Sequence, residues 1–171
     1  GEYAIKTIYP HVTILRPSII FGADDSFFNR FAELANILPA LPLIGGGHSR
    51  FQPVYVGDVA RAVLTCLAQP VTAGHTYELG GPQIMTFKQL MQKMMEFTGK
   101  KRCLISLPWW IARVQAALFC WLPNPPITND QITSLQSDSI VQSESSGFNQ
   151  LHILPTPLDE ILPTYLIKEH A

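Results

Sequence analysis

The sequence predicts an α/β fold with an incomplete parallel sheet, and three observations support this. Short runs of β-branched and aliphatic residues alternate with segments whose apolar residues recur at helical spacing, the order expected of an α/β chain. Residues 11–21 (HVTILRPSIIF) are almost continuously apolar, which is typical of a strand buried on both faces of a parallel sheet. The clear strands are too few for a complete doubly wound sheet.

Individual residues mark the ends of the first predicted strands and helix. Pro17 has no N–H to donate, so we expect it at the end of the first strand or at a bulge. Apolar spacing over residues 27–38 predicts a helix, which Pro39 stops. A short apolar strand at 41–44 ends in the three glycines 45–47.

The next stretch repeats the alternation. The expected order is strand 51–56, helix 59–67, strand 76–79 and helix 87–98. Asp58 is a good N-cap for the first of these helices, a contribution of about 1 kcal/mol. Thr86 caps the second helix, and Gly99 closes it.

The chain changes character after residue 99. Residues 107–122 (LPWWIARVQAALFCWL) form an apolar stretch between two prolines. It predicts a helix too short to span a bilayer, which needs about 20 apolar residues. This helix either covers the protein's own core or packs on a partner or membrane interface. A short helix around 131–135, capped by Thr128, and an amphipathic helix at 155–162 complete the expectation.

Composition excludes several classes of protein. The chain has 171 residues, of which 47% are hydrophobic and only 15% charged; a soluble domain typically has about 25% charged. We therefore expect a large core or apolar surface hidden against something else. A net charge of -1 argues against nucleic acid as a partner. The one basic run, Lys100 to Arg102, is typical of a solvated helix C-terminus.

Cysteines and histidines predict no metal site. Cys66, Cys103 and Cys120 are widely spaced, none lies beside a histidine, and no pair has the spacing of metal ligands. We interpret all three as small buried residues in a reducing compartment. Because the chain opens with a charged residue and no long hydrophobic stretch, we expect no export signal. Because Gly1 stands where a methionine would begin a natural chain, we expect the sequence to be part of something longer.

Two motifs resemble a known superfamily. Residues 15–22 (LRPSIIFG) resemble the segment after the catalytic lysine in extended short-chain dehydrogenases and NAD-dependent epimerases and dehydratases. Residues 47–60 (GHSRFQPVYVGDVA) resemble a second signature of that superfamily, in which an arginine and an aromatic residue precede "V-x-D-V-A". The resemblance implies the C-terminal portion of a Rossmann-type fold, with a partial parallel sheet and a helical substrate-side subdomain. Residues 1–99 would be the Rossmann-like part, and residues 100–171 a mainly helical extension.

A narrower resemblance is also present. Residues 27–31 (FFNRF) together with 51–54 (FQPV) are similar to atypical NAD(P)-binding members related to an accessory subunit of respiratory complex I. Residues 125–131 (PPITNDQ) resemble the C-terminal region of the same members.

No catalytic residue can be assigned. The glycine-rich turn that cradles a pyrophosphate is missing, because 45–47 lacks its spacing. A Tyr-x-x-x-Lys pair is missing too, because Tyr3 and Lys6 are three residues apart instead of four. The resemblance places the true pair upstream of residue 1. NAD(P) is therefore expected in the full-length parent and not in the isolated chain.

The resemblance assigns four residues to the far wall of the site. Pro17 and Ser18 would lie beside the nicotinamide of the cofactor; alternatively, Pro17 only ends a strand. Asn29 and Arg50 would contact the diphosphate of a substrate, since a guanidinium binds phosphate with two hydrogen bonds. Arg50 could equally form a surface ion pair. Asp58 is expected to be a cap and not a site residue.

Two functions remain. The chain is either the substrate-side half of an NAD(P)-dependent oxidoreductase or epimerase-like protein, or part of a non-catalytic nucleotide-binding structural or assembly subunit of a membrane-associated respiratory complex. A stand-alone binding module is a remote third. The expected partners are the missing N-terminal Rossmann half and complex I or a membrane surface, reached through the Trp109-Trp110 helix. The expected location is a bacterial cytoplasm or the mitochondrial matrix, there peripheral to the inner membrane.

Overall fold

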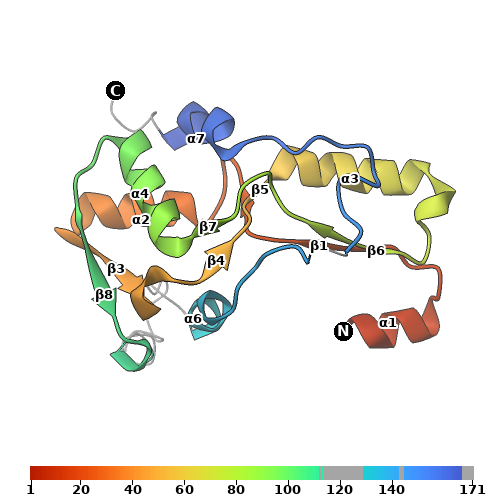
Figure 1. Ribbon diagram of the computed structural model, residues 1–171, viewed down its shortest axis with the longest axis horizontal. Coiled ribbons are helices and arrows are strands. Elements are labelled where there is room, and N and C mark those ends of the chain that lie inside the picture. Colours follow the sequence, from red (N-terminus) through yellow and green to blue (C-terminus); the bar gives the residue numbers. More distant parts are fainter. Residues whose placement is uncertain (112, 114–128, 143–144, 167–171) are drawn as a thin grey trace. The chain divides into compact units, whose positions relative to one another are not determined.

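The chain folds as two compact units, each assembled from separated segments (Figure 1). The computed structural model describes residues 1–111, 113, 129–142 and 145–166. Unit 1 consists of Gly1–Asp25, Gln52–Ile84 and Ile140–Tyr165, and unit 2 of Ser26–Phe51, Met85–Ser139 and Leu166–Ala171. Both units take segments from each side of residue 99. These two units therefore divide the chain differently from the expected domain boundary at residue 99. That boundary stays a prediction.

Unit 1 contains two parallel strand pairs. Strand β1 (Ile14–Pro17) pairs with β6 (Thr76–Leu79), and β2 (Ile20–Phe21) pairs with β5 (Val54–Tyr55). The parallel pairing confirms the predicted partial parallel sheet. The single strand expected over 11–21 is two short strands, and Pro17 ends the first of them as predicted.

Helices and the C-terminal segment complete unit 1. Its helices are α1 (Glu2–Ile8), α3 (Val56–Ala68), the 3-10 turn η2 (Pro70–Thr72) and α7 (Leu158–Leu166). Helix α3 lies along the β1–β6 pair (Figure 1). The core between them is made by six buried side chains: Val54, Ala62, Tyr77, Leu79, Phe148 and Leu151.

Asp58 is not the N-cap that the sequence suggested. Helix α3 begins at Val56, two residues before Asp58, and its N-cap is Tyr55, which makes no side-chain cap hydrogen bond. Asp58 lies in the first turn and is completely buried. The capping rule failed because the carboxylate has a distant partner, Thr156 of the C-terminal segment.

Helix α1 was not predicted and packs weakly. None of its side chains, all of which the structure describes, is buried. It is attached to the sheet by an ion pair between Glu2 and Arg16 at 2.5 Å. A second link is a hydrogen bond of 2.9 Å that Lys6 Nζ donates to Thr76 Oγ1.

Unit 2 combines strands and helices around an aromatic cluster. Strand β3 (Ala40–Ile44) pairs in parallel with β8 (Cys103–Leu107), and β4 (Arg50–Phe51) pairs antiparallel with β7 (Met85–Thr86). The helical elements are α2 (Phe28–Ile37), η1 (Gly45–Gly47), α4 (Phe87–Thr98) and α6 (Asn129–Gln136). Four phenylalanine rings meet edge to face where α2 and α4 pack together: Phe27, Phe28, Phe31 and Phe87.

The helices of unit 2 follow the sequence closely. Helix α4 has the predicted bounds, with a capping box between Thr86 and Gln89, and it ends at Gly99, whose φ is +67°. Strand β8 was not predicted. Its first residue, Cys103, is exposed, which corrects the prediction of a buried thiol, and Cys66 is only partly buried.

The apolar stretch 107–122 is described only at its start. Trp109 to Ile111 are helical, and residues 114–122, Cys120 included, lie outside the described residues, as does the proposed cap Thr128. In the part of the chain that the structure describes, no helix has the length and apolarity that crossing a bilayer requires.

Candidate functional site

The predicted nicotinamide contacts lie at the carboxyl end of β1. In open α/β sheets, ligands bind outside the carboxyl ends of the strands. Pro17 is exposed there and Ser18 is partly buried. The Ser18 N–H donates to the carbonyl oxygen of Leu79 at 2.9 Å, so this backbone donor already serves the sheet. A ligand at this loop would therefore meet the Pro17 ring more readily than a Ser18 donor.

Gln52 joins the loop to two other segments of unit 1. Its backbone N–H donates to Ser18 Oγ at 3.2 Å, and its side-chain Nε2 donates to the Gly81 carbonyl at 2.7 Å. Its Oε1 accepts from the Val141 N–H at 3.0 Å. The side-chain amide of Gln52 thus joins the loop after β6 to the C-terminal segment, and its backbone N–H adds the loop after β1. Gln52 lies inside the second superfamily motif, whose pattern predicted no role for it.

Two glycines make this close approach possible. A Cβ at Gly80 would lie 2.5 Å from Cδ of Gln52, and a Cβ at Gly81 would lie 1.9 Å from the carbonyl oxygen of Pro53. Neither distance leaves room for a side chain. Glycine is therefore required at Gly81, where the clash is with backbone, whereas a side chain at Gly80 would displace the amide of Gln52.

Charged groups flank the same strands. Arg16 pairs with Glu2 and, at 3.4 Å, with Glu78. The pKa of Glu78 is lowered, first by the backbone N–H of Gln142 that its carboxylate accepts. Tyr165 of α7 donates its phenolic O–H to Asp25 at 2.5 Å, and burial raises the pKa of this phenol.

The two predicted substrate contacts lie in unit 2. Asn29 is partly buried in the first turn of α2. Arg50 begins β4 and is held by Asp138. Its backbone N–H donates to Oδ1 at 2.8 Å, and its guanidinium donates to Oδ2 from Nε at 2.9 Å and from Nη2 at 2.8 Å. Arg50 thus forms the ion pair that was its alternative role, and its contact with a substrate stays a prediction.

The Asp138 carboxylate should make the stability of unit 2 depend on pH. Hydrogen bonds from the backbone and side chain of Arg50 lower the pKa of Asp138. In the unfolded chain this carboxyl titrates near its ordinary value of about 4. Its stabilising contribution is therefore complete above about pH 4 and is lost as the pH falls through the lower folded pKa.

We expect Asp138→Asn to flatten this acid-side loss of unfolding free energy, measured by urea unfolding between about pH 5 and pH 2.5. Glu33→Gln, an exposed carboxylate on α2, is the matched control. An acid profile of Asp138→Asn as steep as that of the control would contradict the role of the pair.

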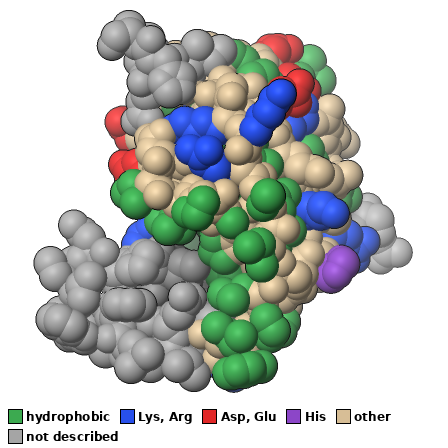
Figure 2. All heavy atoms as spheres, turned by 90° about the vertical axis from the view of Figure 1, so that its left-hand side faces the viewer, with side chains coloured by type: hydrophobic (Ala, Val, Ile, Leu, Met, Phe, Trp, Pro, Cys, Tyr) green, Lys and Arg blue, Asp and Glu red, His purple; other side chains and the backbone are tan. Residues whose placement is uncertain are grey.

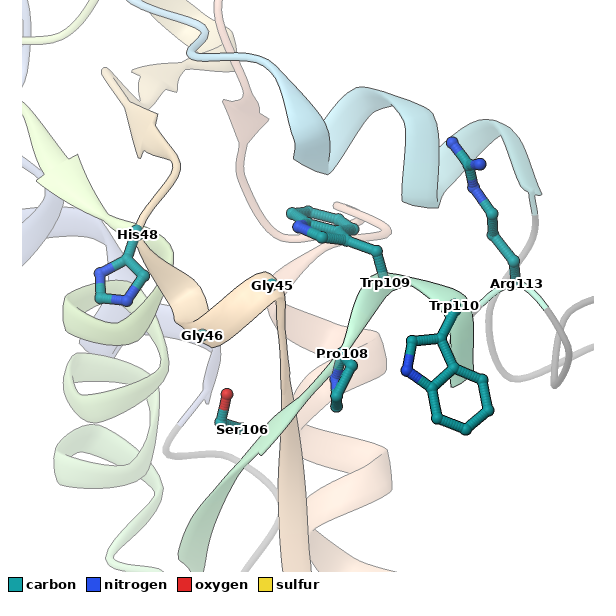
Figure 3. Close-up of a pocket in the computed structure, with 8 residues that line it drawn as sticks. All are labelled: Gly45, Gly46, His48, Ser106, Pro108, Trp109, Trp110 and Arg113. Atoms are coloured by element: carbon teal, nitrogen blue, oxygen red, sulfur yellow. The ribbon is translucent and has the colours of Figure 1, made fainter.

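A surface cavity of about 590 Å³ lies in unit 2, at the ends of β3 and β8 (Figure 3). It is lined by Gly45, Gly46, His48, Ser106, Pro108, Trp109, Trp110 and Arg113. The size suits a small ligand. However, Figure 3 shows Arg113 turned towards α6, where it donates to Gln136 at 3.3 Å, and His48 at the far side. Its polar groups do not converge on one point.

Trp109 closes part of the cavity wall. Its indole lies against Gly45, where an added Cβ would come within 1.9 Å of the ring. Gly45 also has a φ of +62°, which a residue with a side chain rarely adopts. Among the described residues, no group of three His, Cys, Asp or Glu side chains is placed to hold a metal ion.

Comparison with known proteins places the chain beside one set of mitochondrial subunits. No protein-family model matches it. The subunit 9 of the NADH dehydrogenase (ubiquinone) 1 alpha subcomplex of Arabidopsis thaliana is 35% identical over 98% of this chain and 44% of its own length. The Mus musculus protein of the same name is 30% identical, over 99% of this chain and 45% of its own length. The chain therefore spans less than half the length of these relatives.

Solved structures share the fold. A nucleoside-diphosphate-sugar epimerase from Staphylococcus aureus superposes with a TM-score of 0.68 and 19% identity, covering 98% of this chain and 56% of its own. The UDP-glucose 4-epimerase of Thermus thermophilus, solved as a complex with NAD, superposes with a TM-score of 0.64 and 16% identity. The match covers 99% of this chain and 51% of the epimerase. Both confirm the predicted Rossmann-type epimerase and dehydratase fold.

Proposed function

We propose that this chain, a homologue of the mitochondrial NADH dehydrogenase subunit 9 proteins with the fold of NAD-dependent epimerases, forms the substrate-side half of an NAD(P)-binding protein. The observation that carries the proposal is the incomplete fold. The chain matches its relatives along nearly all its own length but less than half of theirs. The strand pairs of unit 1 are fragments of a larger parallel sheet.

The outer surfaces of unit 1 support a missing neighbour. Helix α3 buries Ala62 in the core, yet on its opposite side Leu64 and Leu67 are 65% and 80% exposed. A helix such as α3, which is apolar on both sides, is normally buried on both sides. Helix α1 buries none of its side chains and exposes Tyr3 and Ile8. We infer that the nucleotide-binding half of the parent covers these faces.

The cofactor would be held mainly by that other half. The three glycines of η1 all have positive φ, but strand β4 follows them, so they do not lead into a helix N-terminus that could bind a pyrophosphate. The Pro17 loop would contribute only a contact beside the nicotinamide. The isolated chain would then be neither a nucleotide binder nor an enzyme.

Calorimetry tests this division of labour. We expect no NAD(P)H binding by the isolated chain and binding by the full-length parent, because only the parent would have a glycine-rich turn. A hydrophobic dye should bind the isolated chain more strongly than the parent, since the outer faces of α1 and α3 are covered there. Micromolar binding of NAD(P)H by the chain alone would overturn the proposal.

A second candidate function is a non-catalytic structural or assembly subunit. The relatives favour it, because their names describe subunits of a mitochondrial NADH dehydrogenase. The partner would be the respiratory enzyme, and the location the mitochondrial matrix beside the inner membrane. A Tyr-x-x-x-Lys pair directly before residue 1 of the parent, together with measurable hydride transfer, would favour the first function. Comigration with the assembled dehydrogenase and no turnover would favour the second.

A further inference from the structure

We propose that unit 2 docks on an anionic lipid surface through the outward side of the β3–β8 strand pair. This surface, the outer ribbon face, consists of six residues: Ala40, Pro42, Ile44, Cys103, Ile105 and Leu107. The inference goes beyond the proposed function, because it does not depend on nucleotide binding.

The register of the two strands defines the face. Ala40 lies opposite Cys103, Pro42 opposite Ile105 and Ile44 opposite Leu107. Aligned residues of neighbouring strands point to the same side of a sheet, and side chains alternate along each strand. The other side carries Leu41 and Leu43, which are buried where α2 contacts β3. All six outward positions are therefore apolar, whereas a solvated sheet face normally carries polar residues.

The exposed part of this face lies on β8. Ile105 is 56% exposed, and Cys103 is also exposed. Ala40, Pro42 and Leu107 are partly buried, and Ile44, at the end of its strand, is buried. Trp110, three residues after β8, is 68% exposed and lines the cavity of unit 2. Tryptophan is the side chain most typical of the membrane–water interface.

The net charge of unit 2 is complementary to an anionic surface. Unit 2 has nine Lys and Arg residues against five Asp and Glu, a net charge of +4, whereas unit 1 has three against eight, a net charge of -5. The run Lys100 to Arg102 leads directly into β8. In Figure 2, hydrophobic side chains form a column, and Lys and Arg side chains lie above it together with Asp and Glu side chains.

A lipid surface fits this combination better than a protein partner. Basic residues beside an apolar surface attract anionic headgroups, and tryptophan sits at the headgroup level. The nearby acidic side chains on α2 and α4 are Glu33 and Glu96, which are outnumbered by the basic run. Because no described helix could cross the bilayer, the contact made by these elements is peripheral.

Vesicle flotation tests the proposal on the intact protein. We expect binding to vesicles of phosphatidylcholine mixed with phosphatidylglycerol, weaker binding to pure phosphatidylcholine, and loss of binding at high salt. Lys100→Gln combined with Lys101→Gln should weaken binding by about 25-fold, from about fivefold for each lysine. The double substitution Ile105→Ser and Trp110→Ser should abolish flotation, because it removes two exposed apolar side chains that would enter the lipid surface.

Matched substitutions in unit 1 separate the docking face from general effects. Val71→Ser and Lys6→Gln change exposed residues of the same types and should leave flotation unchanged. Equal binding to neutral and anionic vesicles, or unaltered flotation of the Lys100 and Lys101 variant, would overturn the proposal. Binding to a protein partner but to no vesicle would overturn it as well. Since flotation is measured without nucleotide, its failure is distinct from failure of the proposed function.

Discussion

Replacing Asp58 with alanine is expected to lower the unfolding free energy by about 3 kcal/mol, because a buried carboxylate that accepts several hydrogen bonds is removed. Asp58 is 0% exposed. Its Oδ2 accepts from the Thr156 N–H at 2.5 Å, and its Oδ1 accepts from the Thr156 hydroxyl at 3.0 Å. Arg61 also donates to Oδ1. The arginine is mostly exposed, so its share of the loss is small.

Chemical denaturation of the two variants Asp58→Ala and Asp24→Ala measures this effect. Asp24 is exposed in the loop after β2, and its replacement should change the unfolding free energy by less than about 0.5 kcal/mol. The loss of unfolding free energy in Asp58→Asn should lie between those of the other two variants, since an amide retains one acceptor oxygen. If Asp58→Ala lost no more stability than Asp24→Ala, the carboxylate would not hold the C-terminal segment.

The substitution Gly81→Ala is expected to cost about 3 kcal/mol or more, because overpacking against backbone cannot be relieved by rotating a side chain. The new Cβ would lie 1.9 Å from the Pro53 carbonyl oxygen. The strands around it would have to separate, and Gln52 would lose its hydrogen bond to the Gly81 carbonyl. The melting temperature and the denaturant midpoint should both fall.

Gly99→Ala is the comparison for this variant. Gly99 has open space around its Cα, with no atom within 4 Å of an added Cβ, but its φ is +67°. That substitution should cost about 1 kcal/mol from backbone strain alone. A Gly81→Ala variant as stable as Gly99→Ala would show that the two loops can move apart freely.

The sequence predicted the helices whose ends and apolar periodicity are visible within the segment itself. Helices α2 and α4 were found because Pro39, Thr86 and Gly99 mark their ends and because their apolar residues keep a helical period. Helix α1 was missed because none of its residues is buried, so its sequence carries no core pattern. Strand β8 was missed because five residues after a basic run are too short for periodicity to be read.

The contacts of the candidate site could not be predicted in this way, because they join residues that are far apart in the sequence. Pro17, Ser18, Asn29 and Arg50 were assigned by resemblance alone, and their ligand roles stay predictions. Gln52 and Asp58 were missed or misassigned because their partners are 29 to 98 residues away in the chain. The partners of Gln52 are largely backbone groups, which no side-chain pattern reveals. The ion-pair partner of Arg50 could not be predicted either, since Asp138 is 88 residues distant.

The interleaving of the two units has a consequence for the order of folding. Unit 1 needs residues from the first 25, the middle and the last part of the chain, and its core includes Phe148 and Leu151. During synthesis from the N-terminus, the strand pair β1–β6 could not pack into its complete core until Phe148 and Leu151 had been made. Such high contact order slows folding and leaves apolar surface exposed in the meantime. Unit 1 would therefore be prone to aggregate until its last segment is made.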